Sequence, residues 1–240
     1  MLIRQQRGRN LSAKILIVED DDNLRETLAD NLELEGYQVF SHALVKDAQQ
    51  FLANNSVDIV VLDIMLPDGN GYDLCRWIRS QTNVLILMLT ARNLEKDVVE
   101  GFISGTDDYV SKPYRSSELI LRIKALLRRK SVSITSESQN FNGYQVNWSL
   151  REVYKQDTKV HLTKTAFDIL LYLFEHINKP CSRENILNSV WGDDVYVDNR
   201  TVDNFVSNLK KQLCLVSGEE YQIKTIRGIG YSLVKSLGSD

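Results

Sequence analysis

The sequence predicts two domains: an α/β domain built on a doubly wound, five-stranded parallel sheet, and a smaller α+β domain after it. Short, nearly continuous apolar runs recur in the first half of the chain, which is typical of strands buried on both faces. Segments with apolar residues at helical spacing separate these runs. In the second half, short alternating segments precede three amphipathic segments and a final hairpin-like pair. That order predicts a small sheet, three helices and a hairpin.

Size and composition are those of an ordinary globular chain, with 240 residues, 43% of them hydrophobic and 25% charged. No apolar run approaches the roughly 20 residues that a membrane helix needs. Residues 1–13 carry three arginines but lack the apolar centre of a secretory signal, so we expect a basic, disordered extension and a cytoplasmic protein. The cysteines and histidines are widely scattered, which argues against disulfides and against a His/Cys metal site.

Charge is divided unevenly along the chain. Residues 14–130 hold 14 Lys and Arg against 19 Asp and Glu, and residues 131–240 hold 12 against 13. Because neither half is basic, net charge alone does not predict a nucleic-acid-binding protein. Residues 200–235, however, hold six cations and three anions, which favours such a surface near the end of the chain.

Each of the five strands of the first domain is expected to lead into a helix, which gives a flavodoxin-like sheet covered on both faces. Residues 131–140 are polar and rich in serine, and we interpret them as a linker. The predicted domains are therefore residues 14–130 and residues 141–237. The predicted strands cover residues 14–18, 37–40, 57–62, 84–89 and 108–111.

Polar side chains stand where four of these strands end. Glu19 and Asp20 follow the first strand, Asp63 the third, Thr90 the fourth and Lys112 the fifth. The carboxyl ends of parallel strands meet at one edge of the sheet, so these side chains are expected to converge. Three carboxylates held together repel one another, and Mg²⁺ would balance them. Lys112 and Thr90 could then contact a phosphoryl group on Asp63; the alternative is a purely structural acidic cluster with a lysine counter-ion.

The same positions carry motifs that resemble the receiver domain of two-component response regulators. The motifs are Glu19-Asp20, Asp63 with the nearby Met-Leu-Pro-Asp-Gly-Asn-Gly, Thr90-Ala91, and Asp107-Asp108-Tyr109-Val110-Ser111-Lys112-Pro113. The resemblance covers residues 14–130 and implies that Asp63 accepts a phosphoryl group from a phosphohistidine on a sensor histidine kinase. It also implies a Mg²⁺ site, whose expected ligands are Glu19, Asp20, Asp63 and the backbone carbonyl of Met65.

The resemblance further implies a conformational switch. Lys112 and Ala91 would lie at the phosphate, and the bond between Lys112 and Pro113 would be cis. Thr90 would move toward the phosphate while Tyr109 rotates inward behind it; from the residues alone, this pair could equally be packing residues. Dimerisation is expected through the last strand and its flanking helices, with the interface residues Asp107, Asp108, Glu118 and Arg122.

In the second half, the third amphipathic segment has the features of a DNA-recognition helix. Its apolar residues share one face at about 100° per residue, which leaves cations and amides on the other face. The final hairpin is expected to carry Arg227 near its tip. A merely solvated helix face is the alternative. The residues that we assign to DNA binding are Arg200, Thr201, Asn204, Ser207, Asn208, Lys210, Lys211 and Arg227.

Three helices followed by a hairpin describe a winged helix-turn-helix. With the motifs Arg200-Thr201-Val202-Asp203 and Arg227-Gly228-Ile229-Gly230-Tyr231, residues 141–235 resemble the effector domain of the OmpR/PhoB family. The resemblance implies that the third helix enters the major groove of double-stranded promoter DNA. It also implies that Arg227 meets the adjacent minor groove or backbone, and that residues 192–199 contact RNA polymerase.

The effector half departs from the family pattern at two positions. Ala166 stands where relatives usually carry Glu, which removes half of a capping box with Thr163 and costs about 1 kcal/mol or less. Phe205 replaces a common His at the edge of the core face of the recognition helix, so base readout should differ.

The receiver half departs at Val98 and Val99, which replace a basic residue that relatives commonly pair with an acid equivalent to Glu118. A second expected pair, Asp108 with Arg122, is intact. Dimerisation should therefore lack one salt bridge or be more apolar than in relatives.

The sequence as a whole predicts a phosphorylation-activated transcription regulator rather than an enzyme, with at most slow self-phosphorylation and dephosphorylation at Asp63. Phosphorylation would stabilise a homodimer and place two winged helices on tandem half-sites about 10–10.5 bp apart. One alternative keeps the DNA binding but makes it independent of phosphorylation. A second, a Mg²⁺-dependent phosphohydrolase with Asp63 as nucleophile, is disfavoured because Met65 offers no acid side chain for catalysis.

Overall fold

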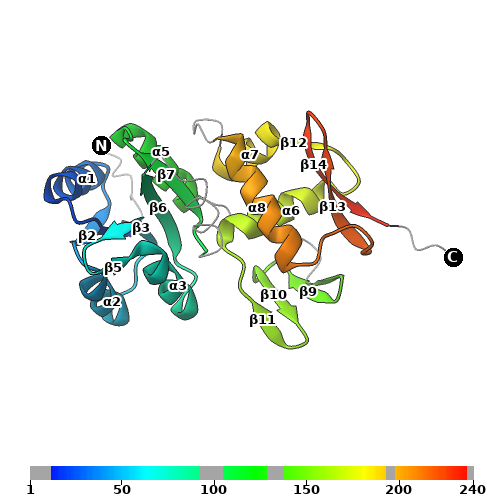
Figure 1. Cartoon of the computed structure of the whole chain (residues 1–240), viewed down its shortest axis with the longest axis horizontal. Coiled ribbons are helices and arrows are strands. Elements are labelled where there is room, and N and C mark those ends of the chain that lie inside the picture. The colour runs from blue at the N-terminus through cyan, green and yellow to red at the C-terminus, as the bar shows by residue number, and fades with distance from the viewer. Residues whose placement is uncertain (1–11, 92–104, 129–137, 193–197, 237–240) are drawn as a thin grey trace, which may run out of the picture.

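The computed structural model describes residues 12–91, 105–128, 138–192 and 198–236, which form two domains packed side by side (Figure 1). Most of the expected N-terminal extension lies outside the described residues. So do residues 92–104, where a helix is expected to follow the fourth strand and where Val98 and Val99 stand. Among the described helices, none is long and apolar enough to cross a membrane.

The first domain contains a five-stranded, fully parallel sheet in the order β2-β1-β3-β6-β7, as predicted. The reversal of strand order beside β1 is what makes the sheet doubly wound. The residues of its central strand β3 are all buried. The strands are β1 (Lys14–Val18), β2 (Gln38–His42), β3 (Ile59–Asp63), β6 (Leu85–Ala91) and β7 (Asp108–Lys112).

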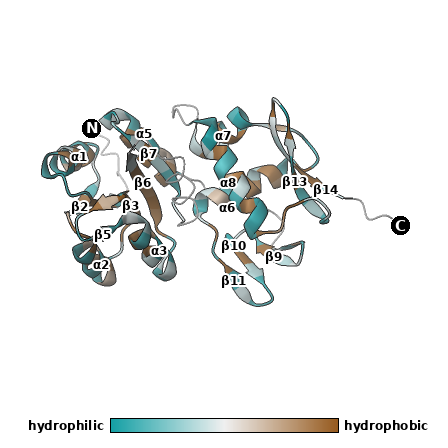
Figure 2. Ribbon diagram, viewed as in Figure 1, coloured by the Kyte–Doolittle hydropathy of each residue, from teal (hydrophilic) through white to brown (hydrophobic). Residues whose placement is uncertain are grey.

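Helices lie on both sides of this sheet, whose strands are largely hydrophobic (Figure 2). Alternate residues of the strands fill two separate apolar cores. Ile15 and Ile17 of β1 pack with α1 and α5, whereas Leu16 and Val18 pack with α2 and α3. A short hairpin, β4 (Met65–Leu66) with β5 (Gly69–Asn70), follows β3. The helices are α1 (Asp22–Leu34), α2 (Val45–Asn54), α3 (Gly71–Gln81) and α5 (Ser116–Arg128).

The second domain begins with a four-stranded antiparallel sheet in the order β11-β10-β9-β8. Its first strand starts inside residues 131–140, which are predicted to be a linker. Gln139 pairs there with Val146, and the next residue of the strand to face inward, Phe141, is buried in the domain core. The strands are β8 (Gln139–Phe141), β9 (Tyr144–Asn147), β10 (Glu152–Lys155) and β11 (Thr158–Val160).

Three helices and a hairpin complete the second domain, as predicted. Aromatic side chains fill the space between sheet and helices, with Trp148 stacked on Phe174 at 4.7 Å between ring centres. The helices are α6 (Lys164–Glu175), α7 (Arg183–Trp191) and α8 (Asn199–Gln212). The hairpin and its partner strand are β13 (Tyr221–Ile226), β14 (Gly230–Lys235) and β12 (Cys181–Ser182).

Gly71 fixes the junction between β3 and α3. Its N–H donates to the carbonyl oxygen of Ile64 at 2.8 Å. A Cβ on Gly71 would overlap the backbone oxygen of Asp63 and lie 2.8 Å from the Cα of Ile64. Backbone atoms cannot turn aside as a flexible side chain can, so a side chain at this position must displace the end of β3.

We therefore expect Gly71→Ala to lower the free energy of unfolding by about 2 kcal/mol, the usual cost of overpacking, in a urea titration. Gly69→Ala is the matched control, because its Cβ would meet only the side chain of Val45, at 3.2 Å. Equal losses in the two variants would contradict the close approach at Gly71.

Candidate functional site

Glu19, Asp20 and Asp63 form an acidic cluster at the carboxyl edge of the parallel sheet. They stand at the ends of the neighbouring strands β1 and β3, and their nearest ligand oxygens lie within 4.8 Å of one another. Glu19 and Asp63 are only 1% and 6% exposed, whereas Asp20 is open to solvent. Strand order thus brings together three carboxylates from two distant parts of the sequence.

Lys112 joins this cluster from the end of β7. Its Nζ donates to Glu19 Oε2 at 2.7 Å and to Asp63 Oδ2 at 2.8 Å. Burial lowers the pKa of Lys112, but the hydrogen bonds to Asp63 and Glu19 outweigh that effect and raise it above its ordinary value. Burial raises the pKa of Glu19; repulsion from Asp63 adds to this, and the bond to Lys112 opposes it. The peptide bond between Lys112 and Pro113 is cis, as predicted.

The charge and chemistry of the cluster fit a divalent cation. Lys112 provides one positive charge against three carboxylates, and the nearby Arg25 forms an ion pair with Asp22 instead. All the side-chain atoms that could coordinate a cation here are carboxylate oxygens, which suits Mg²⁺. Asp20 is exposed, so there is space for water molecules as further ligands. The N–H of Met65 donates to Asp63 Oδ1 at 3.4 Å, which places the Met65 backbone beside the cluster.

Thr90 and Tyr109, the expected switch pair, lie on the neighbouring strands β6 and β7. Thr90 is 4% exposed near the end of β6 and stands opposite Ser111. The hydroxyl of Tyr109 instead accepts a hydrogen bond from Thr201 Oγ1 of α8, at 3.3 Å, and its ring packs against both domains. Burial, above all, raises the pKa of Tyr109. An inward rotation of Tyr109 would break its bond to α8.

Residues expected at a dimer interface form ion pairs within the chain. Arg122, 6% exposed, pairs with Asp108 at 3.1 Å and with Glu118 at 3.0 Å. Asp107 is fully buried, and its backbone oxygen accepts from the hydroxyl of Thr165 in the second domain, at 2.7 Å. In this conformation the second domain covers Asp107, and its place in a dimer interface stays a prediction.

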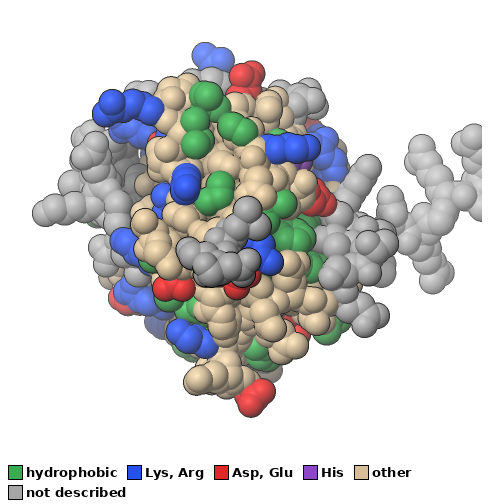
Figure 3. Space-filling view, turned by 90° about the vertical axis from the view of Figure 1, so that its right-hand side faces the viewer, with side chains coloured by type: hydrophobic (Ala, Val, Ile, Leu, Met, Phe, Trp, Pro, Cys, Tyr) green, Lys and Arg blue, Asp and Glu red, His purple; other side chains and the backbone are tan. Residues whose placement is uncertain are grey.

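Polar residues of α8 and the hairpin offer the chemistry expected of a DNA-binding surface. Arg200, Ser207 and Lys211 are exposed, while Asn204, Asn208 and Lys210 are partly exposed. Arg227 is exposed in the turn of the hairpin, where Gly228 adopts a φ of +74°. Figure 3 faces the end of the molecule that carries this hairpin, and Lys and Arg side chains gather toward one side of it.

Two residues of α8, Thr201 and Phe205, are buried in this structure. Thr201 is 2% exposed and faces the first domain. Phe205 is 1% exposed; it packs beside Trp191 in the core and also lines a cavity that includes residues of the first domain. The helix has two covered sides, one against its own domain and one against the first domain, and a single amphipathic projection detects only one of them.

Comparison with known proteins agrees with this geometry. Residues 15–124 match the family described as response regulator receiver domain, and residues 157–233 match that described as transcriptional regulatory protein, C terminal. The phosphate regulon transcriptional regulatory protein PhoB of Rhizobium meliloti is 38% identical over 92% of this chain and 98% of that protein. The transcriptional regulatory protein SrrA of Staphylococcus aureus is 35% identical over 94% and 98%. The chain belongs to the OmpR/PhoB family of response regulators.

Solved structures support the same assignment. The response regulator DrrB of Thermotoga maritima, described as an OmpR/PhoB homolog, is 31% identical, with a TM-score of 0.51 over 93% of this chain and 100% of that one. A mutant of RitR has a TM-score of 0.75 at 23% identity over 94% and 100%, which shows a shared fold.

Asp203 connects α8 to α7 and to the final hairpin. Its Oδ1 accepts from Arg183 Nε at 2.7 Å and from the hydroxyl of Tyr231 at 2.6 Å. The guanidinium of Arg183 also lies over the Tyr231 ring, 5.1 Å from its centre. These three side chains tie α7, α8 and β14 together. Asp203 and Tyr231 were visible in the family motifs, but no sequence spacing connects them to Arg183.

Burial and the hydrogen bond to Asp203 raise the pKa of Tyr231 to about 12. We expect Asp203→Asn to lower this pKa toward the ordinary value of about 10, because the negative charge that opposes ionisation is removed. The pKa can be followed by NMR of protein labelled in its tyrosine rings. Glu152→Gln, which alters the similar contact to Tyr154, is the control and should leave Tyr231 unchanged. A Tyr231 pKa that stays near 12 in Asp203→Asn would mean that burial alone sets it.

Proposed function

We propose that the chain is a phosphorylation-activated transcription regulator in which Asp63 accepts the phosphoryl group of a phosphohistidine on a sensor histidine kinase. An oxygen of the Asp63 carboxylate attacks phosphorus, the phosphorus–nitrogen bond breaks, and the imidazole leaves with its bonding electrons. The product is an acyl phosphate on Asp63. The observation that carries this proposal is the convergence of Asp63 with two further acids and Lys112 at one sheet edge.

Glu19, Asp20, Asp63 and the Met65 carbonyl would hold Mg²⁺ at this edge. The cation would offset the negative charge of the incoming phosphoryl group and of the carboxylates. Lys112 already contacts Asp63, so its ammonium group would stabilise the transferred oxygens. Thr90, with Ala91 beside it, would hydrogen-bond to the phosphoryl group only after transfer, which couples the modification to a movement of β6 and β7.

Asp63→Asn should abolish the gain in DNA affinity that a small phosphodonor such as acetyl phosphate gives the wild type. The amide keeps the shape of the side chain but is not a nucleophile toward phosphorus. Binding to a duplex selected by the treated wild type from a random library is measured by fluorescence anisotropy. Asp157→Asn, in an exposed turn, should respond as wild type does.

Two results would contradict the proposal. If Asp63→Asn gains affinity as the wild type does, Asp63 is not the phosphoacceptor. If neither protein gains affinity, although intact-mass measurement shows that the wild type is phosphorylated, DNA binding is independent of phosphorylation.

The second domain would bind promoter DNA with α8 in the major groove and the hairpin as a wing. Arg200 and Lys211 are exposed on α8, and Arg227 is exposed at the turn of the hairpin, so both elements offer cations to phosphates. A homodimer formed through the face that carries Asp108, Glu118 and Arg122 would place two such domains on tandem half-sites. The loop over residues 192–199, largely outside the described residues, is proposed as the contact for RNA polymerase.

Lys211→Ala and Arg227→Ala should each reduce the slope of log affinity against log salt by about one, because each removes one phosphate contact and the counterion that it displaces. The titration uses the same duplex at several salt concentrations. Lys159→Ala is the control, since Lys159 pairs with Glu152 on the small sheet at 2.5 Å. If neither the Lys211 nor the Arg227 variant changes the slope, these cations do not contact DNA.

A further inference from the structure

Tyr114 carries a buried hydroxyl group that has no hydrogen-bond partner among the described residues. Tyr114 follows the cis bond between Lys112 and Pro113, and its ring packs against the apolar core that contains Ile15 and Ile17 of β1. Every other buried side-chain polar atom that the structure describes in the first domain has a partner. A buried hydroxyl without a partner costs free energy, so this one needs a physical reason.

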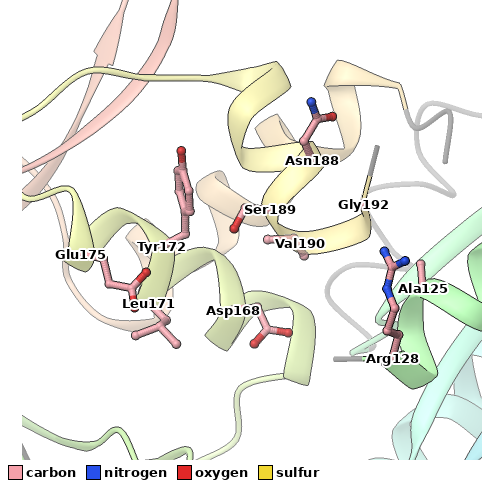
Figure 4. A pocket seen from close by; sticks show the side chains of 10 residues that line it. All are labelled: Ala125, Arg128, Asp168, Leu171, Tyr172, Glu175, Asn188, Ser189, Val190 and Gly192. Atoms are coloured by element: carbon pink, nitrogen blue, oxygen red, sulfur yellow. The ribbon is translucent and has the colours of Figure 1, made fainter. Parts of the chain in front are cut away.

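The hydroxyl does not open onto either of two cavities at the domain boundary. The larger, about 290 Å³, lies between α5 and the helices α6 and α7 (Figure 4). The smaller, about 220 Å³, lies between α3 and α8, where Arg76 and Gln212 line it. Tyr114 lines neither of them. The charged groups that act on its hydroxyl all belong to the first domain.

Those charged groups are two members of the acidic cluster and Lys112. Burial raises the pKa of Tyr114 to about 12; the negative charge of Glu19 adds to this effect more than that of Asp63 does, and Lys112 opposes both. The chain path agrees, because Glu19 stands two residues after Ile17 and Lys112 stands two residues before Tyr114. The hydroxyl thus lies close to the acidic cluster, and Glu19 is the carboxylate that influences it most.

Glu19 is a buried carboxylate that depends on Lys112. Its Oε2 accepts from Lys112 Nζ at 2.7 Å, whereas its Oε1 accepts from the N–H of Asp21 at 3.4 Å. Arg25 donates to the backbone oxygen of Glu19 instead, at 2.7 Å. Among the described residues, Lys112 therefore makes the one short hydrogen bond to this carboxylate. Glu19 is 1% exposed, so water cannot readily replace a lost donor.

A divalent cation at this cluster would disturb that arrangement. The ammonium group of Lys112 bonds to Glu19 and Asp63, two of the carboxylates that would hold the cation. Like charges within a few ångströms of each other repel strongly. Under the proposed function, Lys112 would turn to the transferred phosphoryl oxygens, and Glu19 would lose its short hydrogen bond while it stays buried. A neutral hydroxyl can take the place of the ammonium group without repelling the cation.

We propose that Tyr114 is a positioning residue for the metal site, whose hydroxyl donates a hydrogen bond to the carboxylate of Glu19 when a divalent cation is bound. This bond orients Glu19 toward the cation and keeps the buried carboxylate satisfied after Lys112 leaves it. Tyr114 touches neither the cation nor the phosphoryl group and acts through Glu19. The proposal rests on the proposed function, because it requires that the acidic cluster hold Mg²⁺.

A tyrosine that only packs in the core would behave differently. Its hydroxyl would contribute nothing to cation binding, and phenylalanine would serve equally well with and without Mg²⁺. A positioning hydroxyl has two opposite effects instead. Without a cation it is buried and unpaired, so its removal should stabilise the chain; with Mg²⁺ it has a partner, so its removal should weaken binding.

Tyr114→Phe removes the hydroxyl and keeps the ring. We expect its affinity for Mg²⁺, measured by isothermal titration calorimetry on the full chain, to be about tenfold lower than that of the wild type, because a metal ligand loses its supporting hydrogen bond. In EDTA, its urea unfolding midpoint should be higher than that of the wild type. Tyr37→Phe is the matched control. Tyr37 packs against the same core but precedes β2, at the opposite edge of the sheet, so this variant should bind Mg²⁺ as the wild type does.

A second measurement, on the wild type, keeps the test decisive if Tyr114→Phe does not fold. In protein labelled at the Cζ atoms of its tyrosine rings, the NMR signal of Tyr114 should shift when Mg²⁺ is added, because its hydroxyl gains an acceptor. The signal of Tyr37 should stay in place.

The role of Tyr114 is refuted if Tyr114→Phe binds Mg²⁺ as tightly as the wild type, or if the Tyr114 signal does not move. Either result leaves the proposed function standing, since the wild type still binds Mg²⁺. If the wild type binds no Mg²⁺, the proposed metal site itself is wrong, and the role of Tyr114 fails with it.

Discussion

Repulsion among Glu19, Asp20 and Asp63 is the constraint on which the first domain depends. Parallel strands of the observed order deliver these carboxylates to one edge, and only Lys112, among the described side chains, is seen to form ion pairs with Glu19 and Asp63. A phosphoryl group adds about −1.5 to −2 charges to such a site. A bound cation and movement of polar groups toward the new oxygens would both offset this charge, which makes the site a natural origin for conformational change.

β7 is the element that can carry this change. Within a few residues it carries Lys112 at the acidic cluster and Tyr109 at the domain boundary, and Asp107 immediately precedes it. It is also the edge strand of the sheet, so one side of it has no neighbouring strand among the described residues. Exposed edges tend to attract other surfaces, and here the second domain packs against this side of the receiver. A small displacement of β7 would therefore alter the contacts that Asp107 and Tyr109 make with α6 and α8.

The sequence was sufficient to predict the features that depend on hydrophobic periodicity and on strand order. Continuous apolar runs identify buried parallel strands, and residues at their ends must then converge, which is why Glu19, Asp63 and Lys112 could be grouped from the sequence alone. Contacts between domains leave no such pattern. Asp107 and Thr165 are 58 residues apart, and both are polar residues with ordinary local explanations. Thr201 is predicted to contact DNA because helical periodicity places it on the polar side of α8. Periodicity shows which side of a helix is polar, but not which other part of the chain covers that side.

The hydrogen bonds across the domain boundary are of a kind that costs little to break. Thr165 and Thr201 contribute neutral hydroxyl donors, and a neutral hydrogen bond contributes about 1 kcal/mol net. The buried ion pair between Arg122 and Asp108 lies within the first domain. A boundary built on buried ion pairs would leave charges uncompensated if the domains separated, and the contacts of Thr165 and Thr201 avoid that cost. Asp107 keeps Arg79 as a partner within its own domain, so separation of the two domains would leave its charge paired.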